Sequence, residues 1–234
     1  REVFIMAIYV TGDIHLNHDS AKLNTTFFPE GKNLTKNDYV IICGDCGFWW
    51  DYSKETKWWV NWYNSRPWTT LCVAGNHSNY DNIYGNYGLI DFHGGQARQI
   101  ADSIYYLNNG DIYNLQGKKF FVMGGATSHD KWCRKEHISW WKEEIPSAKM
   151  MEHGLDNLEK NNNKVDYILT HCAPTSIMTY YDPYGFYESD VLTDYLEEID
   201  YNVDYKDWFH GHYHMDKDVD HVHGLYNRVL SIDL

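Results

Sequence analysis

Five short polar clusters in this chain carry the side chains that bind divalent metal ions. They occupy residues 12–15, 44–45, 75–77, 170–171 and 211–214. Together they offer carboxylate oxygens, an amide oxygen and several imidazole nitrogens. Hard and borderline divalent cations prefer such mixed ligands, and the carboxylate of Asp45 has two oxygens with which to bridge two ions. The clusters therefore predict a hydrolytic site that holds two metal ions.

The order of the clusters resembles the signature of the calcineurin-like metallophosphoesterase superfamily. That signature reads Asp-x-His, Gly-Asp, Gly-Asn-His, His and Gly-His-x-His, and the matching stretch runs from Asp13 to His214. One such piece occurs by chance in many proteins, whereas five in the family's order are far more specific. The resemblance implies an α/β fold, a four-layer α/β/β/α sandwich of two mixed β-sheets flanked by helices. It also implies a metal site at the C-terminal ends of strands.

The resemblance implies a role for each matched residue. Seven would bind two divalent ions: Asp13, His15 and His214 the first, Asn76, His171 and His212 the second, and Asp45 both. His77 would be catalytic, near the leaving oxygen, where it could donate a proton or stabilise charge. The ions would share a hydroxide that attacks phosphorus. Manganese is the first expectation for the metal, with iron or zinc as alternatives.

Two His-x-His pairs overlap in residues 210–214. We choose His212 and His214 because they follow Gly211, as in the family's Gly-His-x-His, and glycine allows a tight turn there. His210 is then expected to end a strand, in the core or in support of the site. The other histidines are interpreted as surface or core residues: His18, His93, His129, His137, His153, His221 and His223.

The chain departs from the family pattern at three positions. Leu16 follows His15 where many members have glycine, and Ser78 follows His77 where many have an acidic residue. Phe48 stands where the protein-phosphatase branch has the aspartate of Gly-Asp-x-x-Asp-Arg-Gly, and Asp51 lies further along. The departures leave open which carboxylate tunes His77. They also count against a phosphoprotein phosphatase, because the arginine that usually holds phosphate is missing.

Three arginines elsewhere are candidates for that missing phosphate contact: Arg66, Arg98 and Arg134. Arg134 is favoured over the other two because it lies among aromatic and basic neighbours in residues 124–144. A segment of that composition could form a lid over the site. We expect residues 1–234 to form a single metallophosphoesterase domain, since no linker or repeat suggests a division.

Short apolar runs precede the clusters and predict the strands that position them. These runs cover residues 3–11, 39–43, 70–74, 165–170 and 208–209. Runs of this length that are rich in Val, Ile and Tyr are typical of buried strands. Each cluster therefore follows the C-terminal end of a strand, and loops at these ends converge on one rim of a sheet.

The remaining pattern predicts further strands and three helices. The strands are residues 104–107, 112–115, 120–123 and 225–232, and the helices are residues 54–65, 147–161 and 188–199. Apolar stripes at helical spacing predict which side chains face the core. They are Trp58, Trp59, Trp62 and Tyr63 in the first helix, and Met150, Met151, Leu155 and Leu158 in the second.

The net charge and the cysteine content limit the binding partners and the cellular compartment that we expect. The formal charge is −13 at pH 7, which disfavours long nucleic acids and anionic membranes but permits a small phosphoester, a nucleotide included. Five cysteines without a repeated Cys-x-x-Cys spacing favour a reducing compartment. With no signal-peptide pattern recognised, we expect a cytoplasmic protein. Whether the residues before Met6 are native is left open.

The sequence thus predicts a metal-dependent phosphoesterase that hydrolyses a phosphomonoester or a phosphodiester. One alternative is a nuclease or 2′,3′-cyclic nucleotide phosphodiesterase in which tyrosine or tryptophan stacks on a base. Another is a catalytically weak scaffold with the same fold. The scaffold is less favoured because it has no chemical reason to keep all eight motif residues.

Overall fold

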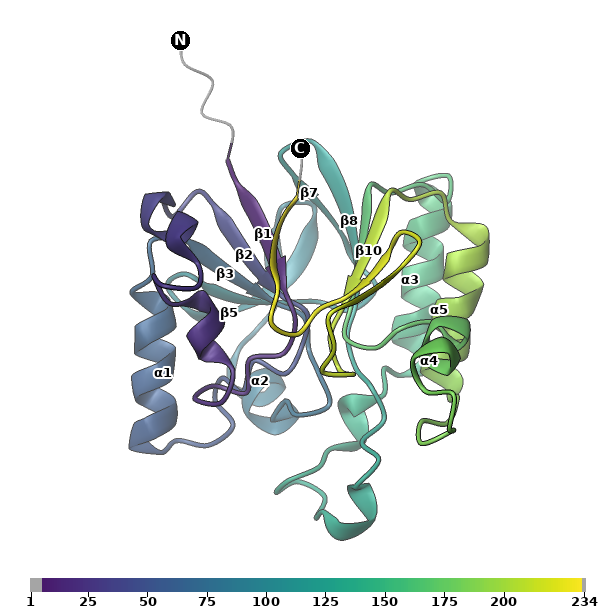
Figure 1. The fold of residues 1–234 in the computed structure, drawn as a ribbon, viewed down its shortest axis with the longest axis horizontal. Coiled ribbons are helices and arrows are strands. Elements are labelled where there is room, and N and C mark those ends of the chain that lie inside the picture. The colour runs from purple at the N-terminus through teal and green to yellow at the C-terminus, as the bar shows by residue number, and fades with distance from the viewer. Residues whose placement is uncertain (1–5, 233–234) are drawn as a thin grey trace.

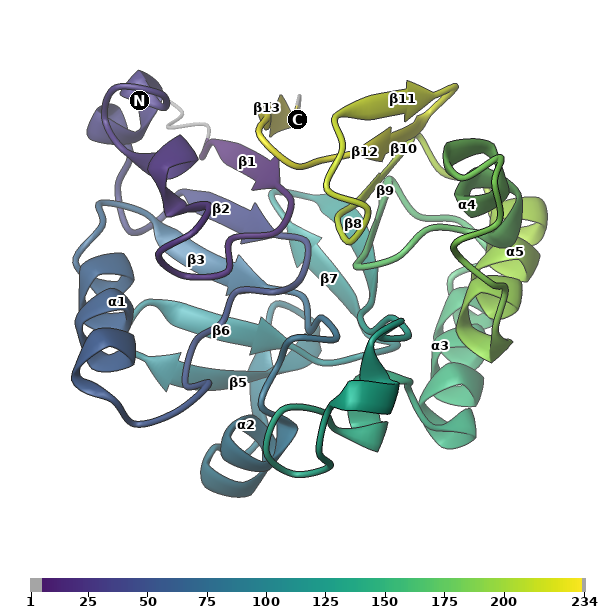
Figure 2. The ribbon, with the colours of Figure 1, turned by 60° about the horizontal axis from the view of Figure 1, so that its bottom comes forward.

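Two mixed β-sheets pack face to face, with helices covering both outer sides (Figures 1 and 2). The structure is a computed structural model that describes residues 6–232. Residues 3–5 of the first predicted strand, and the segment before Met6, lie outside the described residues. The four-layer α/β/β/α sandwich is confirmed. That residues 1–234 form one domain, and that residues 124–144 form a lid, stay predictions.

The first sheet has the strand order β13-β1-β2-β3-β6-β5-β4. Its strands are β1 (Ile8–Thr11), β2 (Tyr39–Ile42), β3 (Thr69–Cys72), β4 (Ile90–Phe92), β5 (Gly95–Ala101), β6 (Ile104–Leu107) and β13 (Val229–Ile232). The second sheet has the order β11-β12-β10-β9-β8-β7. Its strands are β7 (Ile112–Leu115), β8 (Lys118–Met123), β9 (Tyr167–Thr170), β10 (Asp207–His210), β11 (Lys217–Val219) and β12 (Val222–Gly224).

Five α-helices cover the sheets in the described part of the chain. They are α1 (Lys54–Asn64), α2 (Tyr80–Asn86), α3 (Ala148–Lys160), α4 (Thr175–Tyr181) and α5 (Val191–Asn202). Four 3₁₀ helices lie in the connections: η1 (Ser20–Leu23), η2 (Pro29–Asn33), η3 (Lys131–Cys133) and η4 (Lys142–Glu144). Among residues 6–232, no helix is long and apolar enough to cross a bilayer.

The strands are apolar along their length because both faces are covered. In β2, Tyr39 and Ile41 join the core between the two sheets, whereas Val40 and Ile42 join the core beneath α1. Such continuous runs are typical of central parallel strands. A third core lies between the second sheet and helices α3 to α5, where Leu158 packs.

The helical stripes were predicted correctly only in part. Trp58 is 56% exposed, and Leu155 of α3 is also exposed. Gly154 is buried in place of Leu155, and a Cβ on it would lie 2.4 Å from the hydroxyl of Tyr195. A glycine at this position lets α3 approach α5 closely, so the buried face of α3 is turned away from Leu155.

Several element bounds also differ from the predictions. Helix α5 begins at Val191 rather than at residue 188, because the side chain of Asp190 accepts hydrogen bonds from the backbone N–H groups of Leu192 and Thr193. Strand β13 covers only the second half of the predicted strand 225–232. Elements that were not predicted are mostly short: α2, α4, β4, β5, β11 and β12.

Parallel pairing brings the motif loops together. Strands β1, β2 and β3 run parallel in the first sheet, and β8, β9 and β10 run parallel in the second. Their C-terminal ends point to the same edge of the molecule, at the bottom of Figure 1. The segment 124–144, drawn in teal, extends beyond that edge. The edge is therefore where the predicted site residues meet.

Candidate metal centre

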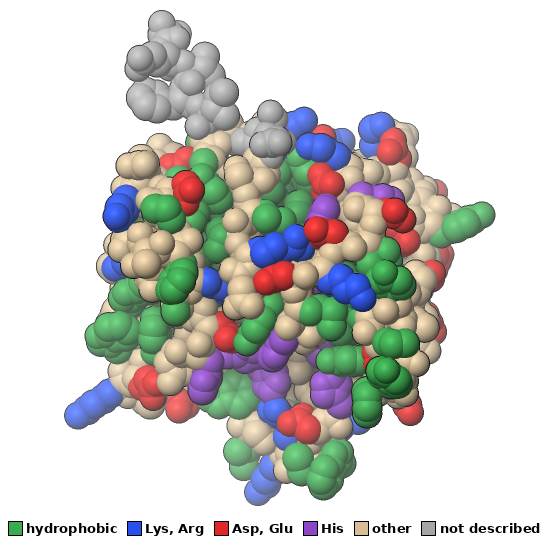
Figure 3. Space-filling view, viewed as in Figure 1, with side chains coloured by type: hydrophobic (Ala, Val, Ile, Leu, Met, Phe, Trp, Pro, Cys, Tyr) green, Lys and Arg blue, Asp and Glu red, His purple; other side chains and the backbone are tan. Residues whose placement is uncertain are grey.

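The structure places all eight predicted site residues at the shared edge of the two sheets. The loops after β1, β2 and β3 supply Asp13, His15, Asp45, Asn76 and His77, and those after β9 and β10 supply His171, His212 and His214. Histidine side chains gather there on the surface, between the sheets and the protruding segment (Figure 3). Residues distant in the sequence thus share one site.

Asp45 lies at the middle of the group. Its Oδ2 atom is 3.4 Å from Nε2 of His15 and 3.3 Å from Nε2 of His171. Its Oδ1 atom accepts a hydrogen bond of 2.7 Å from the backbone N–H of His77. The carboxylate thus turns one oxygen toward both imidazoles, rather than one oxygen toward each.

Asp13 and His214 form one end of the group. Oδ2 of Asp13 lies 3.0 Å from Nε2 of His214, and Oδ1 accepts a 2.8 Å hydrogen bond from the backbone N–H of His212. Asp13 is fully buried, and its Oδ2 has no hydrogen-bond partner of normal geometry among the described residues. A buried carboxylate oxygen without such a partner is costly, and a cation would compensate for it.

Asn76 joins the other two histidines. Its Oδ1 atom lies 2.9 Å from Nε2 of His171 and 3.1 Å from Nδ1 of His212. With metal–ligand bonds of ~2.1 Å, neighbouring ligand atoms on one ion lie about 3.0–3.4 Å apart. The spacings around Asp13 and Asp45 lie in this range, and those around Asn76 lie within 0.1 Å of it. The donor set therefore fits divalent ions, and three groups of these side chains come close enough to hold one.

The protonation of the site also suits a cation. Burial alone would lower the pKa of His171, but the carboxylates of Asp45 and Asp13 outweigh it and raise that pKa to about 9. Burial would also lower the pKa of His15. The hydrogen bond and charge of Asp45, together with the charge of Asp13, outweigh burial and raise that pKa to about 9. The site attracts positive charge, and a metal ion would compete with protons for the same nitrogen lone pairs.

A model of the calcineurin-like phosphoesterase family matches residues 6–216 of the sequence. The chain belongs to this family. No curated protein matches the sequence. Among solved structures, the crystal structure of the phosphopantetheinyl hydrolase PptH from Mycobacterium tuberculosis is similar over 94% of this chain and 88% of that chain. The sequence identity is 15% and the TM-score is 0.41.

Family membership supports a metallophosphoesterase.

Two motif glycines leave room for the side chains of the site. A Cβ on Gly44, whose φ is +100°, would lie 1.8 Å from Nδ1 of His171. A Cβ on Gly211 would lie 2.1 Å from Oδ1 of Asp13. Gly211 is thus required for close approach to a carboxylate, and the expected tight turn is also present, since the backbone N–H of Tyr213 donates a 2.9 Å hydrogen bond to the carbonyl oxygen of Gly211.

Four of the ligand candidates have left-handed backbones. The φ angles are +43° for His15, +46° for Asp45, +70° for His212 and +49° for His214. Leu16 also has a positive φ, +49°, which explains why glycine suits this position in many family members. Non-glycine residues in this region are strained by about 1–2 kcal/mol each. The motif loops hold these residues in place despite that cost.

Several residues that orient the ligands were not predicted from the sequence. Oδ2 of Asp19 lies 2.8 Å from Nδ1 of His15, and the carbonyl oxygen of Cys43 lies 2.9 Å from Nδ1 of His171. Each contact fixes one ring nitrogen as the donor and leaves Nε2 free for an ion. Asp19 is four residues after His15, and this spacing was the one available signal for it.

Ser128 and Glu144 orient the amide of Asn76. The Nδ2 group of Asn76 donates a 3.0 Å hydrogen bond to Oγ of Ser128, which donates one of 2.6 Å to Oε2 of the buried Glu144. The amide oxygen is thereby turned toward His171 and His212. Ser128 follows β8 as the motif residues follow their strands, which is the signal that could have identified it.

Removing this support should weaken metal binding. We expect Ser128→Ala to reduce metal affinity by about 10–100-fold, the usual effect of losing a group that orients a ligand. Titration of the metal-free protein with manganese would measure it. Ser231→Ala, an exposed serine in β13, is the control. Equal affinities in the two variants would show that Ser128 does not orient Asn76.

His77 contacts an arginine rather than a carboxylate side chain. Nη1 of Arg134 lies 3.1 Å from Nδ1 of His77, and Nη2 lies 3.4 Å from Nε2. Burial lowers the pKa of His77, and the Arg134 cation lowers it further, although Asp45 opposes both. Ser78 accepts a hydrogen bond from the backbone N–H of Gly75, and Asp51 accepts from Ser53 and Thr56 at the start of α1.

The other arginine candidates pack elsewhere. Arg66 lies over the ring of Trp62, and Arg98 lies over the ring of Tyr84. His210 is buried, with Nε2 3.1 Å from the hydroxyl of Tyr181. Burial lowers the pKa of His210 to about 4. His129, interpreted as a surface or core residue, is exposed, and its ring lies 5.6 Å from that of His212.

Proposed function

We propose that the chain is a two-metal phosphoesterase that hydrolyses a small phosphomonoester or phosphodiester. The observation that carries the proposal is the position of Asp45, whose Oδ2 faces imidazoles from two different ligand groups. One group would consist of Asp13, His15, His214 and Asp45, and the other of Asp45, Asn76, His171 and His212. The mixed nitrogen and oxygen donors suit manganese, iron or zinc better than calcium.

Each residue has a role that its contacts support. Divalent ions, when bound, would polarise the phosphoryl group and lower the pKa of water at the site. His77 would protonate or stabilise the leaving oxygen, since its backbone is held on Asp45 and its ring lies 5.6 Å from that of His15. The acidic surface would keep long nucleic acids away, so the expected substrate is small.

Arg134 would anchor the phosphate. Its Nε donates a 2.6 Å hydrogen bond to Oδ1 of Asp130, and its Nη1 donates to the carbonyl oxygen of Ser139. These contacts hold the guanidinium beside His77, so Arg134 would supply the phosphate contact for which the sequence lacks an Asp-Arg-Gly arginine. Residues 124–144 would thereby contribute a charge to the site and act as a lid.

Arg134→Ala should lower kcat/KM by about 10–100-fold, because a hydrogen bond to a charged group contributes about 1.5–3 kcal/mol. Steady-state kinetics with p-nitrophenyl phosphate would measure the effect. Lys135→Ala removes an exposed neighbouring cation and serves as the control for net charge. An equal decrease of kcat/KM in both variants would mean that Arg134 acts only through the net charge of the protein and does not contact the phosphate.

Metal stoichiometry tests the proposed function directly. Metal-stripped protein resupplied with manganese should bind two ions per chain, and it should then hydrolyse p-nitrophenyl phosphate or bis-p-nitrophenyl phosphate. Elemental analysis gives the stoichiometry, and nitrophenol release gives the rate. A single bound ion would contradict the two-metal site. Two bound ions without turnover of either ester would favour the scaffold alternative.

A further inference from the structure

Two cavities flank the candidate metal centre. The first has a volume of about 340 Å³ and reaches the centre at His212. The second, of about 360 Å³, reaches it at His15 and His77. Among the described residues, the two share no lining side chain. Each is large enough for a small organic group, since ligand pockets begin at roughly 300 Å³.

The predicted ligands form a row between the cavities. From the second cavity to the first, successive atoms of His15, Asp45, His171, Asn76 and His212 lie 3.4, 3.3, 2.9 and 3.1 Å apart. A phosphoryl group over Asp45, the second residue of this row, would have the second cavity on the side of His15 and the first cavity on the side of His212. The row therefore provides space for two substituents on one phosphorus.

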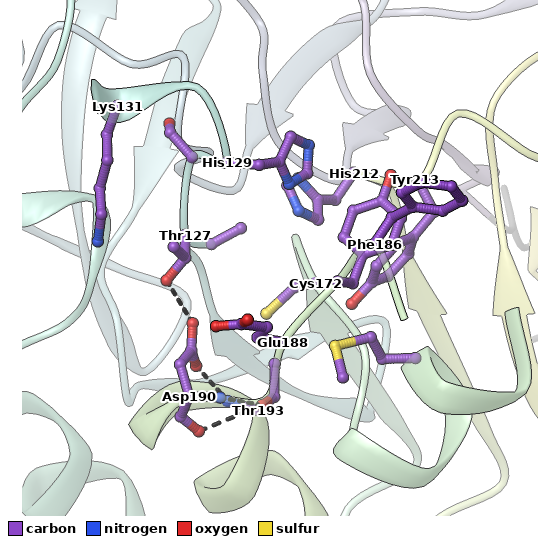
Figure 4. A pocket seen from close by; sticks show the side chains of 14 residues that line it. Thr127, His129, Lys131, Cys172, Phe186, Glu188, Asp190, Thr193, His212 and Tyr213 are labelled. Carbon is purple, nitrogen blue, oxygen red and sulfur yellow. Dashed lines mark hydrogen bonds between the residues drawn. The ribbon is translucent and has the colours of Figure 1, made fainter. Parts of the chain in front are cut away.

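Aromatic side chains line both cavities. Figure 4 shows Phe186 and Tyr213 along one wall of the first cavity, with His129 and His212 at one end. Trp50 lines the second cavity, where its ring lies 6.4 Å from that of His77 and packs edge-on against Trp141 at 5.2 Å. Flat faces of this kind stack on the rings of aryl groups and bases.

Charge distinguishes the two cavities. Asp51 and Glu55 line the second cavity, and no lysine or arginine does so among its described lining residues. The first contains Lys131 together with Glu188 and Asp190. Each cavity has an aspartate that is engaged at the start of a helix: Asp190 caps α5 and accepts a hydrogen bond from Thr127 (Figure 4), and Asp51 accepts hydrogen bonds from Ser53 and Thr56. Lys131 is therefore the charge that distinguishes the first cavity from the second. A further phosphate or carboxylate would thus be disfavoured in the second cavity.

We propose that the substrate is a phosphodiester with two organic substituents, one in each cavity, and that the one beside Trp50 has no further negative charge. This inference rests on the proposed function. In the reaction, water adds to phosphorus and one P–O ester bond breaks. The alcohol leaves with one proton, and the other substituent stays on a phosphomonoester. A monoester substrate would fill only one of the two cavities.

Competition by two diesters of equal charge provides the test. Diphenyl phosphate carries two rings and methyl phenyl phosphate carries one, and both are monoanions. We expect diphenyl phosphate to compete about tenfold more tightly than methyl phenyl phosphate in initial-rate assays of bis-p-nitrophenyl phosphate hydrolysis by the manganese-loaded protein, the size of one stacking contact. Equal affinities would overturn the inference.

Substitutions in the two cavities test whether each cavity binds one phenyl ring of diphenyl phosphate. Phe186→Ala, in the first cavity, and Trp50→Phe or Leu16→Ala, in the second, should each weaken binding of diphenyl phosphate by about three- to tenfold. Methyl phenyl phosphate should respond to changes in only one cavity. Phe186 is 80% exposed, so its replacement should fold normally, and melting curves check the other variants. Unchanged binding of diphenyl phosphate in all three variants would contradict the inference.

Turnover separates this inference from the proposed function. Wild-type protein should have a higher kcat/KM for bis-p-nitrophenyl phosphate than for p-nitrophenyl phosphate, and Phe186→Ala should reduce the difference. A preference for the monoester would overturn the diester inference while leaving the phosphoesterase intact. If no manganese-dependent hydrolysis of either ester occurs, the proposed function itself fails.

Discussion

Asp45→Asn should lose about a thousandfold or more in kcat/KM and should bind fewer than two metal ions. The Oδ2 atom of Asp45 lies 3.4 Å from His15 and 3.3 Å from His171, so it is placed to serve both ligand groups. Asparagine is uncharged, and when its single oxygen keeps the hydrogen bond from His77, an amide NH2 group takes the place of Oδ2 and cannot bind an ion. Ion stabilisation worth several kcal/mol would therefore be lost. Elemental analysis and hydrolysis of bis-p-nitrophenyl phosphate measure both effects.

The control for this variant is Asp91→Asn, which makes the same substitution at an exposed position in β4. It should retain wild-type activity and metal content. Folding needs a separate check, because Oδ1 of Asp45 also accepts the backbone N–H of His77. Asparagine can preserve that hydrogen bond through its own oxygen. Full activity of a folded Asp45→Asn variant would refute the bridging role.

His77→Ala should lower kcat by about 10²–10⁴-fold, the range expected for losing a group that transfers a proton in the transition state. Metal content should stay at the wild-type value, because the proposed ligand groups do not include His77. The decrease should be smaller for esters whose leaving groups are strong acids, since they need less protonation. Comparing p-nitrophenyl esters with phenyl esters would measure that difference.

His221→Ala, at an exposed turn between β11 and β12, is the matched control. The His77→Ala result that would contradict this prediction is a loss of bound metal together with the loss of activity. His77 has a ring nitrogen within 4.8 Å of ligand atoms of His15 and Asp45, so it is close enough to join them on one ion. Loss of metal would make His77 a ligand, and the source of the leaving-group proton would then have to be sought elsewhere.

The motif residues could be predicted because each follows a strand that is itself recognisable. Both faces of β2 are covered, so its sequence is a plain apolar run, and Asp45 comes directly after the turn at Gly44. The supporting residues carry no such local signal. Glu144 reaches Asn76 only through Ser128, and the sequence separations are 16 and 52 residues. Contacts of this kind depend on how the loops cross.

The rotation of each helix about its own axis, which decides the residues that it buries, could also not be predicted from the sequence. The apolar stripe of α3 placed Leu155 inward, but close packing against Tyr195 selected Gly154 for the interface. The exposure of Trp58 has a similar cause. Three tryptophans lie within five residues of α1, more large rings than one side of a helix can bury, so one is left at the surface. Periodicity shows that a helix is amphipathic but does not fix its rotation.

The left-handed backbones of His15, Asp45, His212 and His214 also bear on how this protein would change over evolutionary time. Each is a local cost that selection for catalysis can maintain, since glycine or asparagine would adopt the same conformation with less strain. In a descendant that had lost catalysis, that selection would be relaxed. We expect such descendants to drift toward glycine and asparagine at these four positions first, while the buried residues of β2 and β9 stay apolar. The order in which these substitutions accumulate would show which residues selection keeps for the fold and which it keeps for catalysis.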